Sequence, residues 1–359
     1  MGTAIEGELT PVDEFASKQY KIQPFPEIQK VNCFPITHIA EIIEKKVEYL
    51  VADLLLVEDV GIVSGQPSAL KTWLVSELAV SVSSGTSVFG QFETKKGKVI
   101  CFNAEDNPYS VTRPRMTALA NWKELNLQDL NLFLLDVPTL QLDKRDTQQQ
   151  LSQTIKTEKP SLVIFDPLRP LHSLNEDKAS DMAPLLDFLR SLQRNYGCAI
   201  LLVCHDRKPS KEEGRRESMT RGSNVLEGWR DTAIYLDKME DKIRVTVYHR
   251  GAQAPPPFFF RLQTDNSDGH LVRARLDYLS EQDTNTEKQD KTKKSVRETL
   301  KKHGKLTREE LRAFVKVSKD LLLRVVKEMI ANGELQEIQD VTDKKKKHIQ
   351  FQNQKKENE

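Results

Sequence analysis

The stretch "GQPSALKT", residues 65–72, holds the residue types that bind the phosphates of a nucleotide. Gly65, Lys71 and Thr72 have the spacing of a phosphate-binding loop between an apolar strand pattern and a helical one. In such a loop, backbone N–H groups cradle phosphate oxygens, the lysine neutralises their charge and the hydroxyl binds Mg²⁺. Leu70 departs from the pattern, which has a glycine at that position. The motif alone also fits a strand–turn–helix that resembles a phosphate loop by chance.

The predicted nucleotide contacts extend along the whole loop and into the helix that follows it. They are Gly65, Gln66, Pro67, Ser68, Ala69, Leu70, Lys71, Thr72 and Trp73.

Three further polar residues stand at the ends of apolar strand patterns. Asp166 closes "LVIFD", Glu105 follows "VICFNA" and His205 closes "AILLVCH". Because the carboxyl ends of parallel strands meet at one edge of a sheet, we expect these residues beside the loop. Asp166 could then hold Mg²⁺ together with Thr72, Glu105 could orient the attacking water, and His205 could sense a γ-phosphate. A single carboxylate at a strand end is commonly a turn or cap residue, but three polar groups favour nucleotide hydrolysis.

Strand and helix patterns alternate through the region that holds these residues. Near-continuous apolar runs at 60–65, 97–106, 130–137, 161–167 and 198–205 alternate with helical patterns. Buried strands of this kind predict a mainly parallel sheet covered by helices on both faces, which is the α/β class. The strand patterns from 232 to 263 follow one another closely, which predicts an antiparallel extension of the sheet.

Five stretches in this order resemble the motif series of RepA-type hexameric plasmid helicases, which belong to the RecA-like ATPases. They are "GQPSALKTWLVSELAVSVSSG", "VICFNAEDN", "LVIFDPLRPLH", "AILLVCHDRK" and "RGSNVLEGWRDTAIYL". The resemblance covers roughly residues 58–265 and implies a P-loop ATPase core that uses ATP and Mg²⁺. It also implies that Glu105 is the catalytic carboxylate, Asp166 the Mg²⁺-associated aspartate and His205 the coupling residue. Arg221 matches the arginine finger that reaches a neighbouring subunit, and Arg250 resembles a second finger.

The remaining chain divides into a lead-in, a linker, a second domain and a tail. Residues 1–57 form the predicted lead-in, with a helical pattern over 36–50, and the ATPase core takes 58–279. Residues 280–292 are polar and free of large apolar side chains, which predicts a linker. Three helical patterns and two strand patterns over 293–353 predict a winged helix-turn-helix domain, followed by a polar tail at 354–359.

Charge is distributed unevenly along the 359 residues. From Lys288 to the end there are 20 Lys and Arg against 12 Asp and Glu, so the C-terminal part is basic. A basic domain favours DNA as a partner, although a solvated surface or a protein-binding winged helix has the same composition. In the DNA interpretation, Lys319, Arg324 and Lys327 face phosphates from a recognition helix.

The sequence predicts a cytoplasmic protein with no membrane partner. Its four cysteines have no paired spacing, which is typical of reduced structural thiols. It has no apolar run of membrane-spanning length and no apolar signal-peptide core near its N-terminus.

The leading functional hypothesis is an ATP-dependent DNA helicase, or helicase-like replication ATPase, of a plasmid or other mobile element. It would form a homo-oligomer, a hexameric ring, with single-stranded DNA in its channel and duplex DNA at the winged helix. The charged loop at 205–223 could contact the DNA in the channel, although a flexible surface insertion fits this pattern equally well. The alternatives are a recombinase-like or repair ATPase and a DNA-binding regulator whose ATPase acts as a switch.

Overall fold

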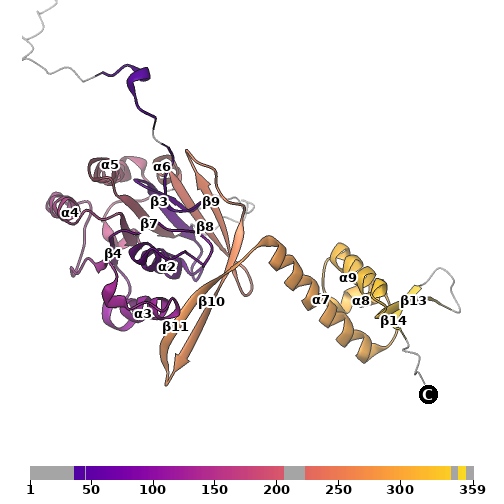
Figure 1. Ribbon diagram of the computed structural model, residues 1–359. Coiled ribbons are helices and arrows are strands. Elements are labelled where there is room, and N and C mark those ends of the chain that lie inside the picture. Colours follow the sequence, from indigo (N-terminus) through magenta and orange to yellow (C-terminus); the bar gives the residue numbers. More distant parts are fainter. Residues whose placement is uncertain (1–35, 45, 206–222, 341–346, 353–359) are drawn as a thin grey trace, which may run out of the picture. The chain divides into compact units, whose positions relative to one another are not determined.

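A computed structural model of the chain describes residues 36–44, 46–205, 223–340 and 347–352 (Figure 1). The chain divides into a unit that ends at Lys46 and a unit that begins at Val47. In the first unit the described residues contain a single 3₁₀ turn, η1 (Ile39–Glu41), so the helix predicted over 36–50 is wrong. The isoleucines of that pattern are exposed, Ile36 at 95 %, and a short helix without a partner for its apolar face is marginal in water.

The second unit is built on a nine-stranded sheet, counted over the described residues. Its order is β11-β10-β9-β8-β3-β7-β6-β4-β5; the strands from β8 to β5 are parallel, and β9, β10 and β11 run antiparallel. The predicted parallel sheet with an antiparallel extension is confirmed, except that β8 belongs to the parallel part. The strands are β3 (Val60–Gly65), β4 (Val99–Asn103), β5 (Leu132–Leu134), β6 (Leu162–Asp166), β7 (Ala199–His205), β8 (Thr232–Lys238), β9 (Ile243–His249), β10 (Phe258–Ser267) and β11 (His270–Leu279).

Helices cover both faces of this sheet, as the continuous apolar strands require. Helices α2 (Lys71–Ser84) and α3 (Arg113–Trp122) pack into one apolar cluster. Helices α4 (Arg145–Glu158), α5 (Ala179–Tyr196) and α6 (Ser223–Trp229) supply the other (Figure 1). Successive residues of β7 alternate between the clusters, Leu201 in the first and Leu202 in the second. Because both faces of the sheet are buried and apolar, polar groups stand at the ends of its strands.

A hairpin from the predicted lead-in also packs into the core. It comprises β1 (Tyr49–Val51) and β2 (Leu55–Leu56), and its leucines at 50, 54 and 55 are almost fully buried. The predicted boundary at residue 57 therefore cuts through packed structure. The sequence interpretation missed this burial, for which four apolar positions within six residues, Leu50, Val51, Leu54 and Leu55, were the available signal.

The C-terminal part has its own apolar core, which contains Val296, Leu311, Val325 and Ile349. The helices and strands of the predicted second domain are present, and Thr307 and Ser318 are N-caps of two of its helices. The elements are α7 (Glu281–His303), β12 (Leu306–Thr307), α8 (Arg308–Val315), α9 (Lys319–Ala331), β13 (Leu335–Gln339) and β14 (Lys347–Phe351), and the strands form a sheet of order β12-β14-β13.

The predicted linker at 280–292 is helical, because α7 begins at Glu281 and continues through it. Ser280 and Asp283 form a capping box that satisfies the first N–H groups of the helix. Glu287 forms ion pairs with Lys242, at 3.4 Å, and with Arg261, at 3.2 Å. The absence of large apolar residues indicated a linker, but capping and ion pairs stabilise a helix without them. No described helix is both long and apolar enough to cross a bilayer.

Candidate active site

The phosphate loop joins the end of β3 to the start of α2. Gln66, Pro67 and Ser68 are exposed, whereas Lys71 is only 6 % exposed. The Lys71 Nζ donates hydrogen bonds to the carbonyl oxygens of Gly65, at 2.8 Å, and Gln66, at 3.1 Å. The first N–H groups of α2 have no acceptor within their own helix, so this helix start favours an anion. The loop thus has the strand–turn–helix form that the motif requires.

Leu70 keeps the loop conformation although the pattern has a glycine there. It is the N-cap of α2 and has φ 59° and ψ 28°, in the left-handed region. This region costs an L-residue about 1–2 kcal/mol, whereas glycine adopts it freely. The Leu70 side chain packs, half-buried, against the larger apolar cluster. The pattern has glycine at this position because the backbone there is left-handed. In this chain, the packing of the Leu70 side chain offsets part of the conformational cost of a leucine.

Gly65 is required by the close approach of the neighbouring strand. A Cβ at this position would lie 2.6 Å from the carbonyl oxygen of Leu236 and 3.0 Å from the Leu236 Cβ. The main chain, which cannot move aside cheaply, makes the shorter of these contacts. A side chain at residue 65 would force β3 and β8 apart just where the phosphate loop begins.

Asp166 and Thr72 meet beside this loop. Asp166 ends β6, is 5 % exposed, and accepts a hydrogen bond from the Thr72 hydroxyl. Burial raises the pKa of Asp166 to about 6, and the Thr72 hydrogen bond opposes that rise. The Asp166 Oδ2 has no hydrogen-bond partner among the described residues. A buried carboxylate oxygen without a partner, next to a hydroxyl, fits the oxygen ligands that Mg²⁺ prefers.

Glu105 lies on the turn that follows β4, and its side chain is exposed. The Glu105 N–H donates to the Asn103 side-chain oxygen at 3.1 Å. Asn103 lies directly opposite Asp166 in the register of β4 and β6, so this turn is at the same sheet edge as Asp166. Glu105 is also close enough to Asp166 to contribute to its raised pKa.

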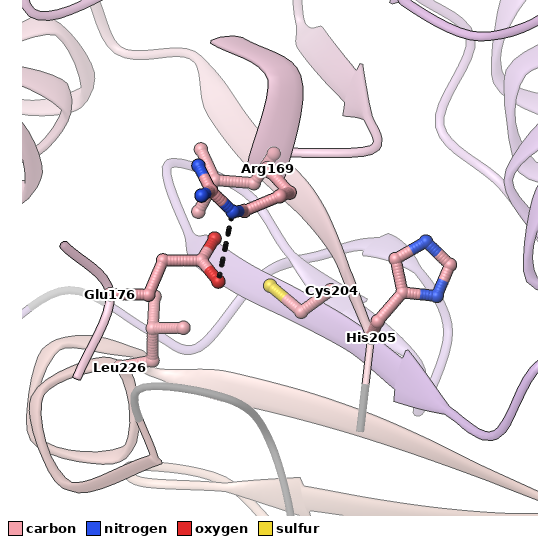
Figure 2. Close-up of a pocket in the computed structure, with 6 residues that line it drawn as sticks. Arg169, Glu176, Cys204, His205 and Leu226 are labelled. Atoms are coloured by element: carbon pink, nitrogen blue, oxygen red, sulfur yellow. Dashed lines mark ion pairs between the residues drawn. The ribbon is translucent and has the colours of Figure 1, made fainter. Parts of the chain in front are cut away.

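His205 ends β7 opposite Gly65 in the register with β3, which places it at the same edge as the phosphate loop. A small cavity beside it is lined by residues that include Arg169, Glu176 and Cys204. Figure 2 shows the Cys204 side chain directed toward the Arg169–Glu176 ion pair and the His205 ring on a different side. The structure therefore brings together Lys71, Thr72, Glu105, Asp166 and His205 at one sheet edge.

Of the two predicted arginine fingers, only Arg250 is among the described residues. Arg221 lies outside the described residues. Arg250 follows His249, which pairs with Thr232, and Thr232 pairs in turn with Gly61 on β3. Gly61 is four residues before Gly65, a separation of about 13 Å along a strand. The Arg250 guanidinium forms an ion pair with Asp231 at 3.4 Å, so it lies near the opposite sheet edge from its own phosphate loop.

The structure adds polar groups around Glu105 that the sequence patterns did not indicate. Asn103, Asp106 and Arg115 are linked by hydrogen bonds next to Glu105. The polar residues of "NAED", directly after an apolar strand pattern, were the available signal for Asn103 and Asp106. Arg115 had none, because its position depends on how α3 packs.

Residues 36–211 match the family described as AAA domain. The comparison with curated proteins found no match. Among the similar solved structures is one titled "Crystal structure of the RadB recombinase", with 18 % identity and a TM-score of 0.42. That likeness covers 60 % of this chain and 90 % of the other. The family match over residues 36–211 and the geometry of the site together support a P-loop ATPase core.

Proposed function

We propose that this protein is an ATP-hydrolysing RecA-like motor that acts on DNA, as a helicase or helicase-like replication ATPase of a plasmid or mobile element. One observation carries the proposal. Lys71, Thr72, Glu105, Asp166 and His205 come from separate parts of the chain and lie at one edge of the parallel sheet. This edge is where α/β proteins bind nucleotides.

Each group at the edge has a role that its chemistry supports. The N–H groups of the loop and the Lys71 ammonium would bind the phosphates of ATP, and Thr72 and Asp166 would hold Mg²⁺. The bound Mg²⁺ would supply charge neutralisation on the phosphates. The exposed Glu105 carboxylate would orient the attacking water and accept its proton. His205, at the end of β7, would contact the γ-phosphate and couple its loss to the loop that follows.

An assembly of several subunits fits the position of the second predicted finger. Arg250 lies toward the sheet edge opposite its own phosphate loop, so it would act on the nucleotide of a neighbouring subunit. Arg221 would act in the same way. These roles support a homo-oligomeric ring, which we propose to be a hexamer with single-stranded DNA in its channel.

The C-terminal part supports a second contact with DNA. We propose that it is a winged helix, in which α9 is the recognition helix. Lys319, Arg324 and Lys327 are exposed on α9, whereas Val325 and Met329 are buried on its other side. These three cations would contact duplex phosphates.

The ATPase core supports a recombinase-like motor equally well. The test must therefore distinguish an ATPase that unwinds duplex DNA from one that only binds a DNA strand. We expect single-stranded DNA to stimulate ATP hydrolysis and ATP to drive unwinding of a forked duplex. The mass in solution with nucleotide should be that of a hexamer. ATP-dependent filaments without unwinding would instead establish the recombinase-like alternative, and operator-specific duplex binding would favour a regulator.

Replacing Lys71 by alanine tests the nucleotide site itself. We expect hydrolysis to fall on the order of 10²–10³-fold or more, because the loop loses its cation. The matched control is Lys156→Ala, which removes an exposed lysine of α4. Wild-type hydrolysis by a folded Lys71→Ala variant would show that the phosphate loop is assigned wrongly.

A further inference from the structure

The turn that carries Glu105 is held by a chain of side-chain contacts. The Asn103 side-chain oxygen accepts from the N–H groups of Glu105, at 3.1 Å, and Asp106, at 2.9 Å. The Asn103 amide donates in turn to Asp106 Oδ2 at 3.3 Å. The backbone of residues 103–106 is therefore folded around the Asn103 side chain.

Arg115 connects this turn to the phosphate-loop helix. One terminal nitrogen of its guanidinium donates to Asp106 Oδ2 at 2.7 Å. The same guanidinium lies over the Trp73 ring, with 5.3 Å from its Cζ to the ring centroid. Trp73 follows Thr72 directly on α2, and Arg115 comes from α3. A continuous path of contacts thus runs from the Glu105 turn to the start of α2.

The position of Arg115 is enclosed and specific. Its side chain is 12 % exposed, and its Nε has no hydrogen-bond partner among the described residues. A planar guanidinium can donate to a carboxylate at its edge while its face lies on an aromatic ring. A lysine ammonium is a point charge and cannot make both contacts with the same geometry. The arrangement therefore uses properties that only arginine has.

We infer that Arg115 is a positioning residue that fixes the Glu105 turn against Trp73, so that Glu105 faces the nucleotide held by Lys71 and Thr72. This inference rests on the proposed ATPase function. Arg115 does not need to touch the nucleotide, because its contacts act on Asp106 and Trp73. Its charge also opposes the acidic groups at this edge, since Asp106 and Glu105 raise the pKa of Asp166 and Arg115 lowers it.

The first test compares turnover with nucleotide affinity. Arg115→Ala should lower kcat about 10- to 100-fold while the Kd for ATP changes less than about threefold, because a positioning contact acts on the transition state. Arg115→Lys should recover only part of the loss. The matched control is Arg113→Ala, which removes the exposed first arginine of the same helix and should leave kcat unchanged.

A double variant shows whether Arg115 acts through Glu105. In a Glu105→Gln background, Arg115→Ala should lower the residual kcat by less than about twofold, since residues that act as a unit are not additive. A full additional loss, or a loss of ATP affinity equal to the loss of turnover, would overturn the inference. Asp106→Asn removes the same ion pair from the other side and serves if Arg115→Ala does not fold.

A second test needs no hydrolysis, so it separates failure of this inference from failure of the proposed function. Amide hydrogen exchange at Glu105 and Asp106 should become about tenfold faster in Arg115→Ala, because the turn that protects these amides loosens. Exchange in the middle of α2 and α5 should stay at its wild-type rate, and Arg113→Ala should change neither. Unchanged exchange at Glu105 and Asp106 would show that Arg115 does not hold the turn.

Discussion

The carboxyl edge of the sheet and helix α9 both present cations, but they do so in opposite environments. Lys71 at the edge is 6 % exposed and bonded to two carbonyl oxygens, whereas Lys319, Arg324 and Lys327 of α9 are exposed. A charge held away from water interacts strongly at short range, while exposed charges are weakened by salt. A single substitution at the edge should therefore remove most of the ATP turnover, whereas each substitution on α9 should lower DNA affinity by a small amount.

The two regions also differ in how the chain assembles them. The groups of the edge come from residues 71, 72, 105, 166 and 205, which only the sheet brings together. The cations of α9 lie within nine residues of one helix. A site assembled from distant segments depends on the whole apolar core of the sheet, whereas the surface of α9 depends only on the small apolar core of the C-terminal part.

The largest expected effect comes from Arg221, which we propose acts on the nucleotide of a neighbouring subunit. We expect Arg221→Ala to lower ATP turnover on the order of 10³–10⁵-fold, which is what an arginine finger supplied by a neighbour contributes. DNA binding should be spared. The decisive measurement mixes Arg221→Ala with Lys71→Ala subunits, because an interface with one intact copy of each residue should recover some hydrolysis. If mixed assemblies form and stay inactive, Arg221 is structural and the shared site is wrong.

Removing the buried charge of Asp166 should change the stability of the protein, which removal of an exposed charge should not. Because burial raises the folded-state pKa to about 6, the ionised form destabilises the native state as pH rises from about 4 to 6. Without Mg²⁺, Asp166→Asn should raise the free energy of unfolding by up to about 3 kcal/mol at pH 7, and this gain should shrink toward pH 4.

Denaturant unfolding at both pH values measures this effect, and the Asp166→Asn variant should also lose hydrolysis. The control is Asp187→Asn, which changes an exposed aspartate of α5 and should alter stability little at either pH. Destabilisation of Asp166→Asn at pH 7 would mean that the carboxylate is stabilised in the folded protein.

A matched pair of triple variants tests whether the exposed cations of α9 contribute to the affinity for duplex DNA. Replacing Lys319, Arg324 and Lys327 by glutamine should lower duplex affinity about tenfold or more and reduce the salt slope by roughly 3, since each lost phosphate contact contributes about 0.9. ATP turnover without DNA should stay the same. The control removes equal charge from another face, with glutamine at Lys301, Lys302 and Lys305. Equal losses in both triples would show that α9 is not the recognition helix.

The smallest expected effect concerns Leu70. Leu70→Gly removes the cost of the left-handed backbone but also the packing of the side chain, so ATP affinity should change less than about threefold, toward tighter binding. Leu70→Ala is the control, because it loses most of the packing and keeps the backbone cost. It should destabilise the fold more than Leu70→Gly does, as measured by thermal unfolding. A large loss of ATP binding in Leu70→Gly would show that the leucine side chain is needed by the loop.

The sequence by itself determined the parallel sheet and the residues of its carboxyl edge. Buried parallel strands are nearly all apolar, so the polar residues that end them stand out, as Glu105, Asp166 and His205 do. Since parallel strands share an edge, their proximity to Lys71 could be predicted without knowing the packing. The helix caps at Thr307 and Ser318 were equally predictable, because a cap depends on residues three positions apart.

Only the tertiary structure decided the features that depend on contacts between distant segments. The hairpin at Tyr49–Leu56 is part of the core because its leucines meet the sheet. Helix α7 replaces the predicted linker because its cap holds it, together with its ion pairs to Lys242, just before β9, and to Arg261 of β10. Arg250 lies away from its own phosphate loop because β9 runs antiparallel to β8. The contact of Arg115 with Asp106 and Trp73 arises from the packing of α3 beside α2, since no local pattern relates these three residues.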